Sequence, residues 1–431
     1  MRKFINGISI MVLCSAFLFT GCNSKKKVVD QEYIALEEYK SFCGELAVHS
    51  EIDGDYSRIY YYDYKSGKEI FACGQANCSH QSSDYIAGKI NCNAVIEGEV
   101  QYPFVYQSKL YYFVVNSNNS VLWKSNTDGT QKEIVAELEF AINNCESAFV
   151  KGNVYITCSN VEETEGEMNK SYISNTRTEI YKVDIGKGNV EQITDMGEKA
   201  ESNIKYIRYF DNKLFFVYSS SQKSYEEAGF DGADDYLKWM ASDNFTYKKD
   251  IELLGKTEKC YTYDLDTKKV ERIDIDFESN FEPYKGIDDM DTYYVLGYAN
   301  DTMYYLNSVV GKYAIYSYNI KTKERKEVLS CFKLVDAYKD NKIYVTGMDM
   351  DEKTKDELIP SADLNKEPTY YIIDVKTGSV TKQDYGVEGK ILYVVDANKE
   401  GLIAYIKDFD AMYDTLDEHS MCTIGGEKIK Q

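Results

Sequence analysis

The sequence is poor in histidine, proline, tryptophan and basic residues. Among 431 residues there are 3 His, 4 Pro and 2 Trp, and 50 Lys and Arg stand against 71 Asp and Glu, a net charge of −21. Lys and Arg supply most nucleic-acid affinity by neutralising phosphates, so this charge argues against nucleic acid as a partner. No Gly-x-Ser-x-Gly elbow, phosphate loop or Gly-x-Gly-x-x-Gly turn is present, and we predict no catalytic residue.

Tyrosine is the residue in excess, with 40 copies, and hydrophobic residues make up 43% of the chain. This hydrophobic share is enough for a large folded core. Aromatic and β-branched side chains favour strands over helices. The composition therefore predicts an all-β protein.

The N-terminus predicts a signal peptide over residues 1–21. Met1-Arg2-Lys3 precede an apolar run from Phe4 to Phe19, which is too short for a permanent membrane span. Cys22 follows Leu18-Phe19-Thr20-Gly21, which resembles the bacterial lipobox and implies that Cys22 is lipidated. Residues 22–31 would then be a tether. We expect the protein at the extracytoplasmic face of the cell membrane, held by its lipid; an ordinary secreted protein is the alternative.

Two short patterns alternate along the rest of the chain, with seven copies of each. The first is a polar turn entering an apolar strand, as in Lys151-Gly152-Asn153-Val154-Tyr155. The second is a strand ending in a polar turn, as in Tyr263-Asp264-Leu265-Asp266-Thr267. Asn, Asp and Gly supply the left-handed backbone that such hairpin turns need.

The alternation of the two patterns predicts the architecture. Two successive hairpins form a four-stranded antiparallel unit, and the first-pattern turns recur 40 to 89 residues apart. Such repetition is the signature of a β-propeller. We predict one domain over residues 32–431, a seven-bladed propeller of four-stranded blades. Six or eight blades are the alternatives, because the first and last copies are degenerate. The tyrosines would mainly pack between blades.

The turns resemble those of known propellers. Ile373-Asp374-Val375-Lys376-Thr377-Gly378 is similar to the blade turns of TolB-type and LDL-receptor-type propellers. The lipobox together with an early Cys-x4-Cys-x-His pattern resembles β-propeller lipoproteins of Gram-positive bacteria. This resemblance implies a cell-surface sensing, binding or scaffolding role. The Tyr-Trp-Thr-Asp run of the LDL-receptor kind is missing, so the ligands of that family are not implied.

The largest insertion spans about residues 219–259, between the second and third strands of the fourth unit. Asp231, Asp234 and Asp235 would begin a helix that holds Tyr236 to Met240, because Asp favours the first turn. This is the one helix that we predict. Insertions gather at one face of a propeller and often build its binding surface, although a lid without function is an equal alternative.

Cys73, Cys78, His80 and Cys92 form a Cys-x4-Cys-x-His-x11-Cys cluster at the end of the first unit. Three thiols and one imidazole are the ligand set of a closed structural zinc site. A disulfide between Cys92 and Cys73 or Cys78 is the competing interpretation in an oxidising compartment. Either a zinc ion or a disulfide would hold this loop together and have a structural role. A structural zinc ion is the one cofactor that we consider.

Two further disulfides are candidates. Cys145 and Cys158 flank the turn at Gly152, and could face each other across one hairpin, either as a disulfide or as a pair of buried thiols. Cys43 lies in the first unit and Cys422 in the last, so a bridge between them would close the ring.

The function that we predict is an extracytoplasmic binding or interaction module, whose partner is an envelope protein or a glycan. The alternative is a hydrolase or lyase acting on a surface polysaccharide, with carboxylates and tyrosines at the mouth of the central channel.

Overall fold

The computed structural model describes residues 31 to 425, apart from 45, 64–67, 117–118, 166–170, 276–291, 310–311, 332–334, 340, 348–366, 387–389, 399–400 and 409–420. The predicted signal peptide, Cys22 and nearly all of the tether lie outside these residues. Strands dominate the part that is described, as the composition predicts.

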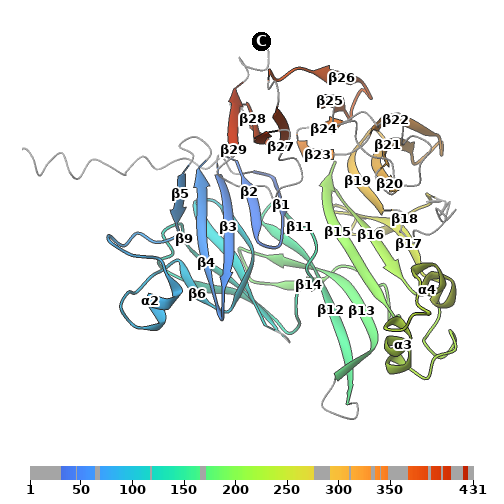
Figure 1. Ribbon diagram of the computed structural model, residues 1–431, viewed down its shortest axis with the longest axis horizontal. Coiled ribbons are helices and arrows are strands. Elements are labelled where there is room, and N and C mark those ends of the chain that lie inside the picture. Colours follow the sequence, from blue (N-terminus) through green and yellow to red (C-terminus); the bar gives the residue numbers. More distant parts are fainter. Residues whose placement is uncertain are drawn as a thin grey trace, which may run out of the picture.

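The strands form seven consecutive units of antiparallel sheet (Figure 1). The first three contain β2 (Lys40–Cys43), β3 (Leu46–Asp53), β4 (Tyr56–Asp63) and β5 (Lys68–Phe71); β7 (Glu99–Tyr106), β8 (Lys109–Val115), β9 (Ser120–Asn126) and β10 (Glu133–Leu138); and β11 (Ser147–Val150), β12 (Asn153–Glu165), β13 (Ser171–Asp184) and β14 (Val190–Gln192). The next two contain β15 (Ser202–Phe210), β16 (Lys213–Ser220), β17 (Thr257–Asp264) and β18 (Val270–Ile273); and β19 (Thr292–Ala299), β20 (Thr302–Val309), β21 (Lys312–Asn319) and β22 (Arg325–Cys331). The last two contain β23 (Val335–Lys339), β24 (Lys342–Gly347), β25 (Thr369–Asp374) and β26 (Val380–Gln383); and β27 (Lys390–Asn398), β28 (Gly401–Asp408) and β29 (Met421–Gly425).

Each of the first six units has four strands, and the described residues of the seventh form three. A short strand, β6 (Val95–Glu97), also pairs with β4 in the first unit. The protein is an all-β β-propeller of four-stranded antiparallel blades, which confirms the predicted fold class. We number the units blades 1 to 7.

The first strand of each blade lies nearest the centre of the ring. Contacts join β2 to β7, β11 to β15, β15 to β19 and β23 to β27, all of them first strands of neighbouring blades. The first and last blades also meet, because Lys40 Nζ lies 3.4 Å from the hydroxyl of Tyr405 in β28. The blades therefore surround a central channel.

An additional strand, β1 (Tyr33–Leu36), lies in this channel, and the sequence analysis does not predict it. Tyr33 is opposite Val150 of β11, and Leu36 is opposite Ser41 of β2. Through β1, blades 1 and 3 join into one ten-stranded sheet. The backbone N–H of Lys151 donates to the carbonyl of Glu32 at 2.9 Å, so β1 starts beside the turn between β11 and β12.

The two sequence patterns are the turns of the blades, as predicted. In the first pattern Asp211 and Asn212 have φ of 47° and 61°, in the left-handed region. In the second pattern the Asp264 carboxylate accepts hydrogen bonds from the backbone N–H groups of Asp266 and Thr267, at 3.1 and 2.8 Å. Asp184, Asn319 and Asp374 accept from their own turns in the same way.

The two turns of a blade also bind each other. In blade 4 the N–H of Leu265 donates to the carbonyl of Asn212 at 3.1 Å, and the same bond recurs at Ile185 to Gly152, Ile320 to Asp301 and Val375 to Asn341. Both patterns therefore lie on one face of the propeller, which we call the turn face.

Tyrosine side chains pack between blades, which confirms the role predicted for them. Tyr298 of blade 5 lies with its ring centre 4.9 Å from that of Phe215 in blade 4. Tyr338 of blade 6 meets Phe210 of blade 4 edge to face at 4.6 Å. Among the largest fully buried side chains are seven tyrosines: Tyr62, Tyr102, Tyr112, Tyr206, Tyr236, Tyr305 and Tyr405.

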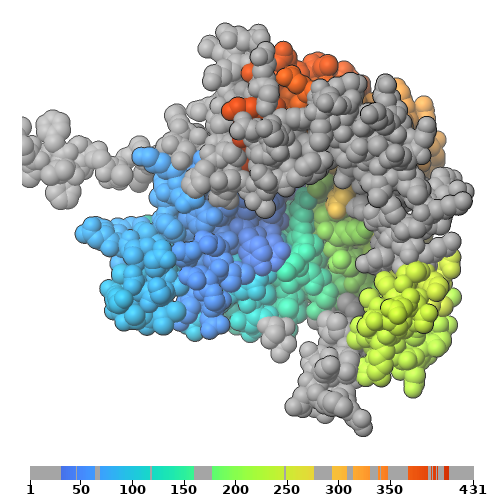
Figure 2. All heavy atoms as spheres, viewed as in Figure 1, coloured from blue at the N-terminus to red at the C-terminus, as the bar shows by residue number. Residues whose placement is uncertain are grey.

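The insertion follows β16 and ends at β17, as predicted, and lies away from the turn face. It contains the predicted helix, α3 (Ala233–Met240), and a second one that we do not predict, α4 (Tyr247–Leu254). Figure 2 shows this yellow-green segment as a knob at the edge of the molecule. A third helix, α2 (Ser82–Ile86), lies between blades 1 and 2. Within the described residues, no helix has the length and apolar character to cross a membrane.

Candidate functional site

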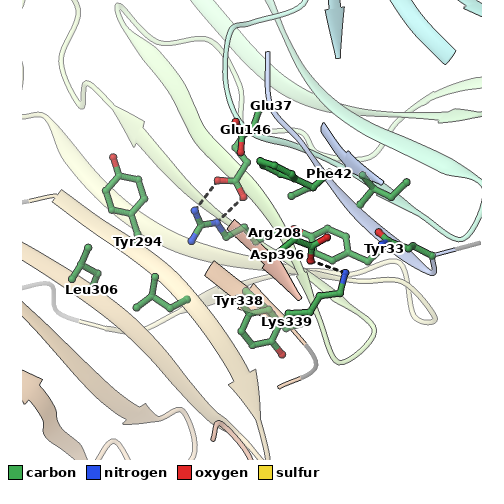
Figure 3. A pocket seen from close by; sticks show the side chains of 15 residues that line it. Tyr33, Glu37, Phe42, Glu146, Arg208, Tyr294, Leu306, Tyr338, Lys339 and Asp396 are labelled. Carbon is green, nitrogen blue, oxygen red and sulfur yellow. Dashed lines mark hydrogen bonds and ion pairs between the residues drawn. The ribbon is translucent and has the colours of Figure 1, made fainter. Parts of the chain in front are cut away.

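A pocket of about 350 Å³ lies in the central channel (Figure 3). This volume is in the range of small-molecule sites. Its wall comes from β1, from β2, from the residue before β11 and from the inner strands of blades 4 to 7. The lining residues are Gln31, Tyr33, Ile34, Ala35, Glu37, Phe42, Glu146, Arg208, Phe210, Tyr294, Leu296, Leu306, Tyr338, Lys339 and Asp396.

Arg208 of β15 organises one side of this pocket. Its Nε and Nη2 donate to the two carboxylate oxygens of Glu146 at 2.8 and 2.7 Å, and its Nη1 donates to the carbonyl of Val295 at 2.8 Å. The rings of Tyr206 and Tyr294 lie 5.1 and 5.9 Å from its Cζ. These contacts join blades 3, 4 and 5, so Arg208 holds the wall together.

The charge of Arg208 is firmly retained. Burial alone would lower the pKa of the guanidinium, but the charge of Glu146 and the hydrogen bonds to it outweigh burial and raise that pKa. Because each of the three nitrogen atoms already donates to a protein acceptor, this guanidinium is a structural group of the pocket wall.

Lys339 and Asp396 form a second ion pair in the pocket, 3.1 Å from Nζ to Oδ1. Lys339 ends β23 and Asp396 lies in β27, so this pair joins blades 6 and 7 as Arg208 joins blades 3 to 5. Figure 3 shows both pairs beside the pocket. The wall is thus built from side chains that are far apart in the sequence.

Glu37, in the turn between β1 and β2, is the lining carboxylate without such a pair. Among the described residues no hydrogen bond or ion pair reaches its side chain, which lies in the wall of the pocket. The surrounding protein raises the pKa of this carboxyl through desolvation, Lys40 acts in the opposite direction, and Glu146 raises it further. Glu37 is therefore available to a ligand.

From the sequence we predict a site at the channel mouth but none of these residues. Glu146, Arg208 and Asp396 are single charges among 121 charged side chains, and only closure of the ring brings them together. A signal for β1 did exist, because Tyr33 and Ala35 alternate with the buried Ile34 and Leu36.

The predicted Cys/His cluster is confirmed as a cluster. Ligand atoms of Cys73, Cys78, His80 and Cys92 all lie within 4.8 Å of one another. Cys73 lies two residues after the end of β5, and Cys92 lies three residues before the start of β6. His80 Nδ1 lies 3.3 Å from Cys92 Sγ. The structure thus places a possible metal site between blades 1 and 2.

The thiols of this cluster differ in acidity. Burial would raise the pKa of Cys73, but hydrogen bonds from the backbone of Gln75 and Asn93 and from the neighbouring thiols outweigh it and lower that pKa. Burial raises the pKa of Cys92 to about 12, and the Cys78 thiol adds to this. Burial lowers the pKa of His80, which favours the neutral imidazole that metals bind.

The structure describes three of the four cysteines in the other predicted pairs. Cys145 and Cys158 are free thiols, and Cys145 Sγ lies 2.9 Å from the hydroxyl of Thr157. Cys43 is also free, and its sulfur accepts a hydrogen bond from the N–H of Val105 at 3.4 Å. Cys422 lies in β29, but its side chain is outside the described residues. Both bridges stay predictions.

A small core around Tyr225, Tyr236 and Leu254 of the insertion also includes Ala200, which precedes β15. Lys256 Nζ lies 2.6 Å from Asp250 and also pairs with Glu201, which precedes β15. Leu237 and Met240 of α3 are 43% and 38% exposed. The insertion is thus an ordered segment of the propeller, and it lies on the side away from the turn face.

The chain is similar to solved β-propeller structures at low identity. An acylaminoacyl peptidase in complex with Z-Gly-Gly-Phe-chloromethyl ketone is 12% identical over 86% of this chain and 49% of its own, with a TM-score of 0.43. TolB from Acinetobacter baumannii is 14% identical over 84% of this chain and 76% of its own, with a TM-score of 0.31. The β-propeller domain of the Trilobed protease from Pyrococcus furiosus is 14% identical over 89% of this chain and 99% of its own, with a TM-score of 0.39.

This chain spans about half the length of the acylaminoacyl peptidase. No family model and no curated protein sequence matches it. We take no activity, substrate or partner from these similarities.

Proposed function

We propose that this protein is a lipid-anchored, extracytoplasmic β-propeller that binds a unit of an envelope glycan in its central pocket. The observation that carries the proposal is the pocket of about 350 Å³, with the unpaired carboxylate of Glu37 and the aromatic side chains of Tyr33, Phe42 and Tyr338. Aromatic rings can pack on the apolar face of a sugar ring, and a carboxylate accepts hydrogen bonds from its hydroxyl groups.

The charge of the lining favours a neutral or basic sugar. The charges of Glu146 and Asp396 are balanced by Arg208 and Lys339. The carboxylate of Glu37 therefore gives the pocket lining a net charge of one negative unit. An acidic sugar would place like charges together in a partly desolvated channel, which costs binding energy.

The geometry also suits anchoring through Cys22. Glu32 is held beside Lys151 and Tyr209 at the turn face, where the predicted tether would join the propeller. Glu32 is ten residues after Cys22 in the sequence, and an extended chain spans at most about 3.6 Å per residue. The turn face would lie within roughly 36 Å of the membrane, and the insertion would point outward.

One observation favours the alternative, a polysaccharide hydrolase. Desolvation raises the pKa of Glu37, as a general acid requires. A glycoside hydrolase usually needs a second carboxylate to act as a base or nucleophile. The two other lining carboxylates are engaged with Arg208 and Lys339, so we favour binding.

Titration of the detergent-purified full chain with neutral, basic and acidic envelope oligosaccharides tests the proposal. We expect neutral or basic sugars to bind, and Glu37→Gln to weaken them about tenfold, which is the loss of one charged hydrogen bond. Glu137→Gln, on exposed β10 in blade 2 outside the pocket, is the matched control. Equal affinity of Glu37→Gln and the intact chain would refute the pocket as the site, and capture of an envelope protein without any sugar binding would refute the glycan.

The same titration separates the two functions. Release of new reducing ends by the intact chain, and its loss in Glu37→Gln, would show the hydrolase instead. Anchoring has its own test, because palmitate labelling of the protein should disappear in Cys22→Ala. Labelling that persists in that variant would remove the lipoprotein part of the proposal.

A further inference from the structure

The connection between blades 1 and 2 carries four soft or borderline metal ligands in twenty residues. Cys73 and Cys92 stand at its two ends, and Cys78 and His80 lie in the loop before α2. Their ligand atoms lie within 4.8 Å of one another. Two sulfur ligands on one zinc ion, each at about 2.3 Å in a tetrahedron, are roughly 3.8 Å apart. The four groups are thus already near the spacing that a zinc ion would impose.

The backbone of the loop is shaped to aim these side chains inward. Asn77 and His80 have φ of 61° and 54°, a left-handed conformation that non-glycine residues adopt at a cost. The His80 ring also stacks on Phe71, with ring centres 4.5 Å apart and planes 19° apart. This contact fixes the imidazole so that Nδ1 points to Cys92.

The composition of the cluster favours a metal over a disulfide. A disulfide would use two of the three cysteines and leave one thiol and the imidazole without a role. Three thiolates and one imidazole instead form a complete tetrahedral set. Thiolate and imidazole together select zinc among the common divalent ions, and a closed set leaves no position for a catalytic water.

The cluster sits directly on blade 2. Asn93 donates from Nδ2 to the carbonyl of Asp128, at 3.4 Å, in the turn between β9 and β10. A Cβ at Gly129 would lie 2.4 Å from the carbonyl oxygen of Ala72, next to Cys73. Holding the two ends of the connection together would therefore also hold it against this turn.

We propose that Cys73, Cys78, His80 and Cys92 bind one zinc ion, which fastens the connection between blades 1 and 2 onto the β9–β10 turn. The role is structural, since the site is closed and lies apart from the central pocket. The proposal does not depend on the glycan or on the lipid anchor.

The test is elemental analysis of the full-length protein, purified in detergent without oxygen, chelator or added metal. We expect about one zinc per chain, and Cys78→Ser to lose most of it. Cys260→Ser removes a buried thiol of blade 4 and is the matched control, which should keep the metal. His80→Cys should keep zinc with four thiolates, whereas His80→Ala should lose it.

Two further measurements guard against variants that fail to fold. The intact protein, stripped by a chelator and refilled with Co²⁺, should gain the near-ultraviolet thiolate-to-cobalt absorption. Hydrogen exchange of residues 72–94 should become faster in the stripped protein and return to its original rate when zinc is added. Absence of metal in the intact protein, together with a non-reduced peptide that joins Cys92 to Cys73 or Cys78, would overturn the proposal in favour of the disulfide.

Discussion

Arg208 and Glu146 form a two-pronged ion pair across the joint between blades 3 and 4, with N–O distances of 2.8 and 2.7 Å. The two side chains are 21% and 25% exposed, so the pair is largely removed from solvent. Removal of one member of such a pair leaves the other charge without its partner, and this loss is larger than the net worth of the pair.

We predict that Arg208→Met lowers the free energy of unfolding by about 3 kcal/mol. Glu146→Gln should cost a similar amount, and the double variant should cost less than the sum of the two. Urea unfolding of the four proteins measures this coupling. Purely additive losses would show that the pair does not act as a unit. Removal of the exposed Arg272 beside Asp274 should leave stability nearly unchanged.

Gly129 is predicted to be far less tolerant than another glycine with the same backbone. Gly129 and Gly54 have φ of 72° and 67°, so alanine costs about 1 kcal/mol of strain at either. A Cβ at Gly129 would also meet the carbonyl of Ala72 at 2.4 Å, whereas nothing lies within 4 Å at Gly54. Thermal unfolding should therefore show a much larger loss for Gly129→Ala. Equal losses would mean that the contact between blades 1 and 2 is looser than the structure has it.

The turn aspartates predict a dependence of stability on pH. Hydrogen bonds from the backbone N–H of Thr267 hold the pKa of Asp264 below its usual value, and Thr377 does the same for Asp374. A carboxyl with a lowered folded-state pKa contributes stability above its unfolded value of about 4, and this stability is lost as the pH falls through the folded value.

Asp264→Asn should therefore keep the turn and remove its share of the acid sensitivity. Blade 5 already has Asn319 at this position, with its side-chain oxygen bound to the N–H of Thr322 at 2.9 Å. We expect Asp264→Asn to resemble the intact protein at pH 7 and to lose less stability between pH 5 and 3. Asp264→Ala, which removes the acceptor, should be less stable at both ends. An unchanged pH profile for Asp264→Asn would contradict this role.

These turns explain which parts of the fold could be predicted from sequence. The conformation at Asp211, Asn212 and Asp264 depends on their own side chains and their nearest neighbours, so the pattern of residues carries it. The same holds for α3, whose first turn contains Asp234 and Asp235, two of the three predicted acidic residues. The sequence also contains signals for α4, which we do not predict. Thr246 accepts from the N–H of Lys249 at the start of this helix, and Gly255 ends it at φ 62°.

The central pocket could not be predicted in the same way. Arg208, Lys339 and Asp396 meet only because the ring closes, and no spacing in the sequence encodes that meeting. Strand β1 shows an alternation over only four residues, and its partner β11 lies more than a hundred residues away, so this signal does not place the strand in the channel. The Cys/His cluster was accessible because all four residues lie in one connection.

We predict that a substitution inside the insertion, Tyr236→Phe, has a local effect and leaves the blades intact. Tyr236 of α3 donates from its hydroxyl to Asp250 of α4 at 2.7 Å, and Lys256 contacts both groups. Tyr236→Phe removes a hydrogen bond to a charged group, worth about 2 kcal/mol, from the small core that holds the insertion. Hydrogen exchange of residues 224–256 should become faster, while β16 and β17 keep their rates. Tyr261→Phe, whose hydroxyl makes no hydrogen bond within the described residues, should change neither region. If Tyr236→Phe speeds exchange throughout blade 4, the insertion is a part of the blade's cooperative core and not an independent unit.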